Sequence, residues 1–86
     1  MPFRRSDEPE LDELSRALAE QVAWERTRRG LTQVELATLC GTTQSAVARL
    51  EKGTRPPRLD TLLRIANALD CELDVSLRPR TTPGEQ

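Results

Sequence analysis

The sequence predicts a mainly α-helical domain, a bundle of four to five helices followed by one short β-strand at residues 71–78. Apolar residues recur at helical spacing along most of the chain, and two segments carry helix start and stop signals. Over residues 71–78 the apolar period changes from 3.6 to 2, which is typical of a half-buried strand. The 86 residues suffice for one domain with one small core.

The first helix is expected to begin near Pro9, a favourable first-turn residue, and to end before Gly30. Residues 1–8 are charged and lack periodicity, which predicts a flexible lead-in. Trp24 lies off the apolar stripe of this helix and either packs on a neighbouring element or is partly exposed. The stripe itself consists of Leu11, Leu14, Leu18 and Val22.

A short second helix is expected after Thr32, over residues 33–40. Thr32 and Glu35 have the spacing of a capping box, in which the Thr hydroxyl accepts the backbone N–H of Glu35 and the Glu side chain bonds back to the N–H of Thr32. Gly41 can adopt the left-handed conformation that closes a helix. Both ends of this helix are therefore marked by local chemistry.

A third helix, over residues 44–52, is expected to start at Thr43 as N-cap and to stop at Gly53. Its apolar stripe contains Val47 and Leu50. A three-residue turn joins it to the second helix, and two short helices joined in this way make a helix-turn-helix. Its outward-facing residues are Gln44, Ser45 and Arg49.

The apolar residues between Leu59 and Leu69 predict a fourth helix, which completes a domain over residues 9–70. The strand that follows would leave its backbone donors and acceptors unpaired if it stood alone. Its expected partner is the same strand of a second copy, antiparallel across a two-fold axis, which would close a homodimer. The apolar face of this dimerisation strand consists of Cys71, Leu73, Val75 and Leu77.

The register of this pairing follows from the position of the axis. If the axis passes near Val75, Glu72 of one copy faces Arg78 of the other, a favourable cross-strand pair. Residues 79–86 contain two prolines and polar residues, which predicts a disordered tail.

Composition excludes several classes of function. The chain has no histidine, which removes histidine-based catalysis and most zinc sites, so we expect no enzyme, no metal and no cofactor. Cys40 and Cys71 stand far apart without a CxxC pattern and are expected to be reduced. Cys40 is interpreted as core filler rather than a reactive thiol. The same holds for Cys71, with a disulfide across the dimer as the alternative.

No membrane span is expected. The longest stretch without a charged residue, residues 36–48, is 13 residues long and contains polar side chains. Arg4 and Arg5 are followed by acidic residues rather than by an apolar signal segment. These patterns predict a cytoplasmic protein.

The net charge of −1 conceals a basic middle. Residues 26–64 carry seven Arg and one Lys against three acidic residues, a net charge of +5, while residues 1–25 carry −4 and residues 65–86 carry −2. A localised basic segment favours an anionic partner such as nucleic acid, and the alternative is a solvated charged face.

The helix-turn-helix lies inside the basic segment, and the second helix of such a unit can enter the DNA major groove. Gln44 can donate to and accept from adenine in one bidentate contact. Gln33 begins a helix whose free N–H groups can meet a phosphate. The candidate DNA-binding residues are Gln33, Thr43, Gln44, Ser45, Arg49, Arg55 and Arg58.

Each candidate also has a structural interpretation. Thr43 is an N-cap whatever else it does, and Ser45 can be a small surface residue. Arg49 could contact guanine or a phosphate, and it could equally be solvated. Arg55 and Arg58 flank the Pro-Pro turn, where they could clamp the backbone, enter the minor groove or remain solvated.

Three stretches together carry a family resemblance. Gly30-Leu-Thr-Gln-Val-Glu-Leu-Ala37, Gly41-Thr-Thr-Gln-Ser-Ala-Val47 and Leu50-Glu-Lys-Gly53 resemble the Xre/Cro/C1 family of phage-repressor-type helix-turn-helix domains over residues 18–70. The resemblance implies a compact helical bundle and operator binding as a dimer. It also implies base recognition by Gln44 and Ser45, and phosphate contact by Gln33. Finally, it implies an internal ion pair between Arg26 and Glu51, and the inward position of Glu51 on the third helix supports that pair.

The sequence departs from this family in three places. Arg58 stands where a Ser or Asp cap is usual, and Asp70 replaces the common Gly after the fourth helix. The strand at residues 71–78 is not general to the family but is similar to the C-terminal strand of HipB-type antitoxins.

These observations predict a dimeric transcriptional repressor that binds a palindromic operator in double-stranded DNA. The leading hypothesis is the antitoxin and autoregulator of a toxin–antitoxin pair, with a cognate toxin as protein partner. The alternative is a phage- or restriction-type regulator without a toxin partner. A hypothesis of another class is an adaptor that contacts only proteins.

Overall fold

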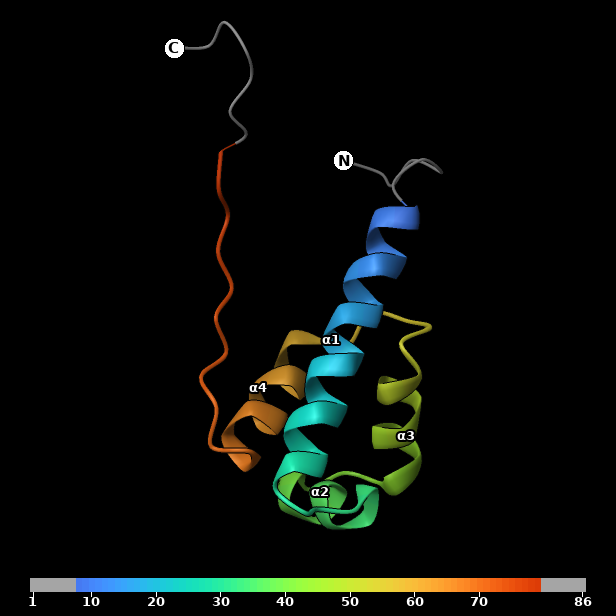
Figure 1. Ribbon diagram of the computed structural model, residues 1–86, viewed down its shortest axis with the longest axis vertical. Coiled ribbons are helices and arrows are strands. Elements are labelled where there is room, and N and C mark those ends of the chain that lie inside the picture. Colours follow the sequence, from blue (N-terminus) through green and yellow to red (C-terminus); the bar gives the residue numbers. More distant parts are fainter. Residues whose placement is uncertain (1–7, 80–86) are drawn as a thin grey trace, which may run out of the picture.

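The computed structural model of the chain describes residues 8–79, and four helices account for most of that range (Figure 1). The predicted helices are confirmed close to their expected bounds: α1 spans Glu8–Arg28, α2 spans Gln33–Cys40, α3 spans Gln44–Lys52 and α4 spans Leu59–Ala68. Within residues 8–79, no helix is both long enough and apolar enough to cross a membrane. The lead-in is predicted over residues 1–8 and the disordered tail over residues 79–86. Of these, residues 1–7 and 80–86 lie outside the described residues.

The ends of α2 and α3 are fixed by the predicted caps. The N–H of Glu35 donates to Thr32 Oγ1 at 3.1 Å, and the N–H of Thr32 donates to Glu35 Oε1 at 2.8 Å. The hydroxyl of Thr43 accepts a backbone N–H from the first turn of α3 at 3.1 Å. Gly41 and Gly53 close the two helices in the left-handed conformation, with φ of 69° and 70°. These caps satisfy backbone groups that would otherwise be orphaned at helix ends.

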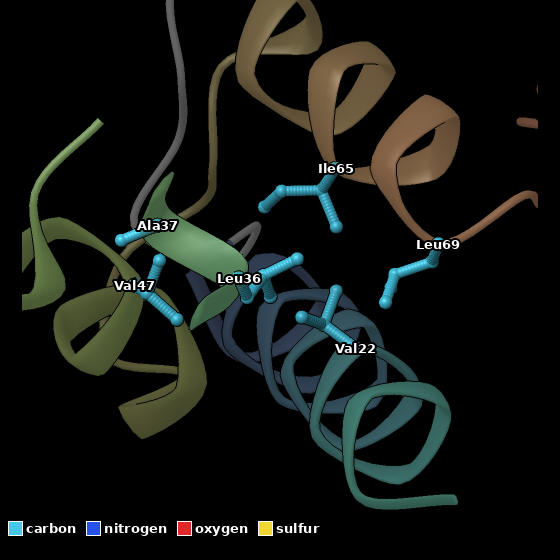
Figure 2. Packing of buried hydrophobic residues seen from close by; sticks show 6 residues of the cluster. All are labelled: Val22, Leu36, Ala37, Val47, Ile65 and Leu69. Carbon is cyan, nitrogen blue, oxygen red and sulfur yellow. The ribbon is translucent and has the colours of Figure 1, made fainter. Parts of the chain in front are cut away.

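One apolar core joins the four helices. Figure 2 shows its side chains converging around Leu36, which is 0% exposed. Burying a side chain of this size contributes roughly 1.5–3 kcal/mol. The core consists of Val22, Leu36, Ala37, Val47, Ile65 and Leu69.

The buried face of α1 differs from the predicted apolar stripe. Leu14 is 58% exposed, whereas Ser15 and Ala19 are buried. Gly53 approaches this face of α1 closely: a Cβ there would lie 3.1 Å from the Cα of Arg16 and 3.2 Å from the Cβ of Ala19. The small side chain of Ala19 lets the chain after α3 pack against α1 at this point.

Replacing Gly53 with alanine is expected to destabilise the protein by more than about 2 kcal/mol. The left-handed conformation alone costs an alanine roughly 1–2 kcal/mol, and the added Cβ would also meet α1 backbone at 3.1 Å. Gly41→Ala is the matched control, because Gly41 has φ of 69° but no heavy atom within 4 Å of its Cβ position. Denaturant unfolding compares the variants, and equal losses would show that the contact with α1 costs nothing.

The turn after α4 is made by Asp70, whose φ of 55° is left-handed although the residue is not glycine. The N–H of Asp70 donates to Asn67 O at 3.2 Å and the N–H of Cys71 donates to Ala66 O at 2.7 Å, the two bonds of a Schellman motif. The turn reverses the chain, and residues 71–79 form an extended segment that runs in the opposite direction to α4 and on past the level of its N-terminal end (Figure 1).

Residues 71–78, the predicted strand, do not pair with another strand within residues 8–79. The segment forms no β-bridge with any other part of residues 8–79. Leu73 is half-buried, but Val75 is 67% exposed and Leu77 is 98% exposed. The half-buried character expected of the whole strand is therefore limited, in one chain, to its first residues. The strand and its pairing across a dimer stay a prediction.

Three side chains with open interpretations take defined positions. Trp24 is 59% exposed and carries the Arg28 guanidinium 5.1 Å from its ring centroid, so it is not part of the core. Cys40 packs against the core, and burial raises the pKa of its thiol. Cys71 also packs against the core, and both cysteines are free in the described chain.

Candidate nucleic-acid interface

The helix-turn-helix of α2 and α3 presents one edge of α3 to solvent. The turn at residues 41–43 begins with the left-handed Gly41 and reverses the chain between the helices. Val47 is buried against the core at 1% exposure. This anchoring leaves Ser45 and Arg49 exposed on the opposite side of α3, and Gln44 is exposed as the first residue of the helix.

A partly buried ion pair lies behind this edge. Arg26 Nε donates to Glu51 Oε2 at 2.7 Å, and its Nη2 donates to Glu51 Oε1 at 2.9 Å. The two side chains are only 13% and 8% exposed. Burial by itself would raise the pKa of Glu51, but hydrogen bonds from Arg26 and Gln33 outweigh it and hold that pKa below its ordinary value. Glu51 is therefore charged at neutral pH, and Arg26 neutralises it.

A chain of side-chain hydrogen bonds connects this ion pair to the surface. Gln33 Nε2 donates to Glu51 Oε1 at 3.1 Å, and Gln33 Oε1 accepts from Gln44 Nε2 at 2.8 Å. Gln33 and Gln44 are the first residues of α2 and α3, so their bond joins the two helix N-termini. Within the described chain, the Oε1 of Gln44 and its second Nε2 proton make no hydrogen bond. Gln44 is thus oriented by one bond and keeps one acceptor and one donor free.

The electrostatic character of this edge favours an anion. Each helix N-terminus carries a partial positive charge from its unsatisfied N–H groups, and here two of them adjoin. Glu51 is the one acidic residue between Cys40 and Leu59, and Arg26 already neutralises it. The same stretch contains four cations, Arg49, Lys52, Arg55 and Arg58.

The structure does not bring Arg55 and Arg58 together with Gln44. Both arginines follow the C-terminal end of α3, and Gln44 lies at its start (Figure 1). A helix of nine residues is about 13 Å long, so the two arginines form a separate basic region. Arg58 is exposed, forms an ion pair with Asp60 at 3.2 Å and gives α4 no side-chain cap.

Sequence reasoning missed Lys52 and the linking role of Gln33. Ser45, Arg49 and Lys52 are all exposed and stand at positions i, i+4 and i+7, so they share one stripe of α3. That spacing alone could have identified Lys52. The bond between Gln33 and Gln44 joins residues 11 positions apart on two helices. No spacing rule within one helix predicts such a bond, because it depends on how α2 and α3 cross.

Known proteins resemble this chain in sequence. A family model described as helix-turn-helix matches residues 22–76. An uncharacterized HTH-type transcriptional regulator of Haemophilus influenzae is 37% identical over 59 residues, 69% of this chain and 60% of that protein. The regulator y4dL of Sinorhizobium fredii is 36% identical over 65% of this chain and 29% of its own length. The regulator YqaE of Bacillus subtilis is 40% identical over 62% of this chain and 46% of its own length.

A solved structure resembles the fold. The restriction-modification controller protein C.AhdI from Aeromonas hydrophila superposes with a TM-score of 0.67 and 34% identity, covering 71% of this chain and 88% of that one. Against the curated relatives, this chain spans between 29% and 60% of their lengths. Their names are those of HTH-type transcriptional regulators.

Proposed function

The chain belongs to the Xre/Cro/C1-type helix-turn-helix family, and from this premise we propose that it regulates transcription by binding double-stranded DNA sequence-specifically. In this proposal the N-terminal end of α3 enters the major groove and α2 lies across the phosphate backbone. The names of the relatives support a regulatory role, and the geometry of α2 and α3 supports contact with DNA.

The observation that carries the proposal is the oriented amide of Gln44. Recognition of adenine in the major groove needs one donor and one acceptor side by side, because adenine presents the N6 amino group and N7 there. Gln44 keeps its Oε1 acceptor and one Nε2 proton free, while its other Nε2 proton is donated to Oε1 of Gln33. A side chain fixed in this way loses less conformational entropy on binding than a free glutamine would.

Phosphate contacts would position the domain on the duplex. The N–H groups at the start of α2 and the amide of Gln33 are suited to one phosphate, since this end of the helix carries positive potential. Arg49, Arg55 and Arg58 are exposed cations on either side of this region. Thr43 and Ser45 add hydroxyl groups at the start of α3. Such contacts fix register and orientation, while the base contacts give specificity.

The chain would bind as a homodimer to a palindrome. Antiparallel pairing of the segment at residues 71–78 relates two copies by a two-fold axis, and two recognition helices could then reach successive major grooves about 34 Å apart. Occupying a promoter in this way represses it by occlusion. The apolar residues Val75 and Leu77 support the pairing, because they are 67% and 98% exposed in the part of one chain that the structure describes.

Two biological settings fit this activity. The likeness to C.AhdI, which covers 88% of that controller protein, favours a restriction-type regulator. The resemblance of the C-terminal segment to HipB-type antitoxins favours the antitoxin of a toxin–antitoxin pair. The adjacent reading frame distinguishes them, since a kinase-like or ribonuclease-like toxin and a restriction–modification enzyme have different sequences.

Titration against DNA at several salt concentrations tests the proposal. We expect a palindrome selected from a random duplex library to bind far more tightly than unrelated DNA. Its affinity should fall roughly 10³-fold to 10⁵-fold between 50 and 200 mM salt, as six to ten phosphate contacts require. The matched control is a duplex of the same composition with one half-site scrambled. Absence of binding even at low salt would contradict the proposal and favour a protein-only adaptor.

A further inference from the structure

A groove lies between α1 and α4. Its volume is about 620 Å³ and its lining is mainly apolar. Its lining includes the buried Val22 and Ile65, the exposed Trp24, and Leu73 from the C-terminal segment. α1 separates α4 from α3 in Figure 1, so the groove is distinct from the candidate DNA-contacting edge.

Only part of the apolar face of the C-terminal segment, residues 71–79, lines the groove. Cys71 and Leu73 line the groove, and because side chains alternate along an extended chain, Val75 and Leu77 belong to the same face. Those two residues are 67% and 98% exposed. Among residues 8–79, therefore, one copy has an apolar groove that is not filled and an apolar face that is not covered.

Antiparallel pairing of two copies brings these two features together. With the two-fold axis at Val75, each Leu73 stands directly opposite Leu77 of the second copy, about 5 Å away across the strand pair. Residues directly opposite each other in an antiparallel pair point to the same face. Leu77 of the second copy is thus placed on the groove side, next to the Leu73 that already lines it.

From this register we propose that the groove between α1 and α4 is the binding site for Leu77 of a second copy of the chain. The proposal rests on the homodimer put forward above and adds to it the surface on which the partner docks. Charge supports the same partner, because the register places Glu72 opposite Arg78 on the solvent face of the strand pair.

The register also excludes one covalent link between the copies. Cys71 lies four residues from the axis in each copy, which separates the two thiols by about 27 Å along the strands. A disulfide requires Cα atoms within about 7 Å. The dimer is therefore held without a Cys71 disulfide, and reducing agent should not dissociate it.

Trp24 reports on the occupancy of the groove. It is the single tryptophan of the chain, it lines the groove, and its side chain is more than half exposed in one copy. A leucine seated beside it would shield the indole from a soluble quencher. The accessibility of Trp24 to acrylamide should therefore decrease as protein concentration rises and the dimer forms.

Leu77→Asp tests the proposal, with sedimentation equilibrium and acrylamide quenching as the two measurements. Two buried leucines are lost per dimer, and each is worth about tenfold or more in affinity, so the dimer dissociation constant should rise by about 100-fold or more. The quenching of Trp24 in the variant should match that of the wild-type monomer. Leu59→Asp is the matched control, because Leu59 is 66% exposed and lies outside the groove. It should change neither measurement.

A cross-link separates failure of this proposal from failure of the dimer. Val75→Cys, with Cys40 and Cys71 replaced by serine, should form a disulfide between copies, since the two residues meet at the axis. If the link forms but Leu77→Asp leaves Trp24 shielded, the groove has another occupant and the proposal is wrong while the dimer stands. If no link forms and the wild type stays monomeric, both are wrong. Binding of one DNA half-site is measured separately and does not depend on either.

Discussion

Replacing Glu51 with alanine is expected to lower the free energy of unfolding by about 3–5 kcal/mol, because it strands a partly buried charge. The Arg26 guanidinium, whose side chain is 13% exposed, would lose the carboxylate that accepts two of its hydrogen bonds. Gln33 would lose an acceptor as well. A domain of this size loses roughly 4–8 °C of melting temperature per kcal/mol, so the melting temperature should fall by more than about 12 °C.

Glu35→Ala is the matched control for this experiment. Glu35 is also an acidic residue with a defined partner, but it is exposed and serves only the capping box of α2. Losing such a cap costs about 1 kcal/mol. A melting temperature of Glu51→Ala within a degree or two of the wild type would contradict the assigned role of the Arg26–Glu51 pair.

The same carboxylate gives the protein a defined acid sensitivity. The pKa of Glu51 is lower in the folded chain than its ordinary value of 4.5. The folded state therefore binds this proton less readily than the unfolded state. The resulting stabilisation is complete above pH 4.5 and is lost as the pH falls through the lower, folded value. Glu51→Gln has no proton to gain there, so its stability should approach that of the wild type on acidification.

The features that sequence predicted well are those set by neighbouring residues. The capping box of Thr32 and Glu35 forms because both groups lie within one turn of the same helix. Gly41 and Gly53 end their helices because each provides a left-handed residue at the right place. Such signals do not depend on the rest of the fold, which is why the bounds of α2 and α3 could be predicted closely.

The features that sequence predicted poorly depend on how helices meet. Leu14 has the spacing of a core residue yet is 58% exposed, whereas Ser15 and Ala19 are buried, and Gly53 approaches α1 closely at Ala19. Leu59 and Leu63 belong to a strongly apolar helix, but they are 66% and 52% exposed. A hydrophobicity scale ranks leucine above alanine at every position. It therefore cannot predict that a small residue is buried where two elements approach closely.

The candidate site shows the same division. Helical spacing predicted which residues of α3 are exposed. Those residues, Gln44, Ser45 and Arg49, are the ones proposed for DNA contact on this helix. The hydrogen bonds from Glu51 through Gln33 to Gln44 could not be predicted, because they connect three side chains that only the tertiary fold brings together. Those hydrogen bonds hold the exposed side chain of Gln44 in a defined orientation.

Replacing Gln44 with alanine is expected to abolish most of the preference for the operator over other DNA. A bidentate contact to adenine contributes about 1–3 kcal/mol of discrimination. A dimer makes that contact twice, so the ratio of specific to non-specific affinity should fall by a factor between about 30 and well above 1,000. Arg49→Ala is the comparison variant: if Arg49 contacts a phosphate, affinity falls for all sequences alike and the salt slope decreases by about one.

Gln33→Ala determines whether the bond to Gln44 matters for recognition. The variant keeps the Gln44 amide but removes the acceptor that holds its Nε2 at 2.8 Å. If orientation by Gln33 contributes to base recognition, the loss of selectivity in Gln33→Ala and Gln44→Ala is not additive, and the double variant is scarcely worse than Gln44→Ala alone. Additive losses would mean that Gln33 contacts DNA independently of Gln44. Full selectivity in Gln44→Ala would mean that the start of α3 does not face the bases, because no other exposed amide stands at that end of the helix.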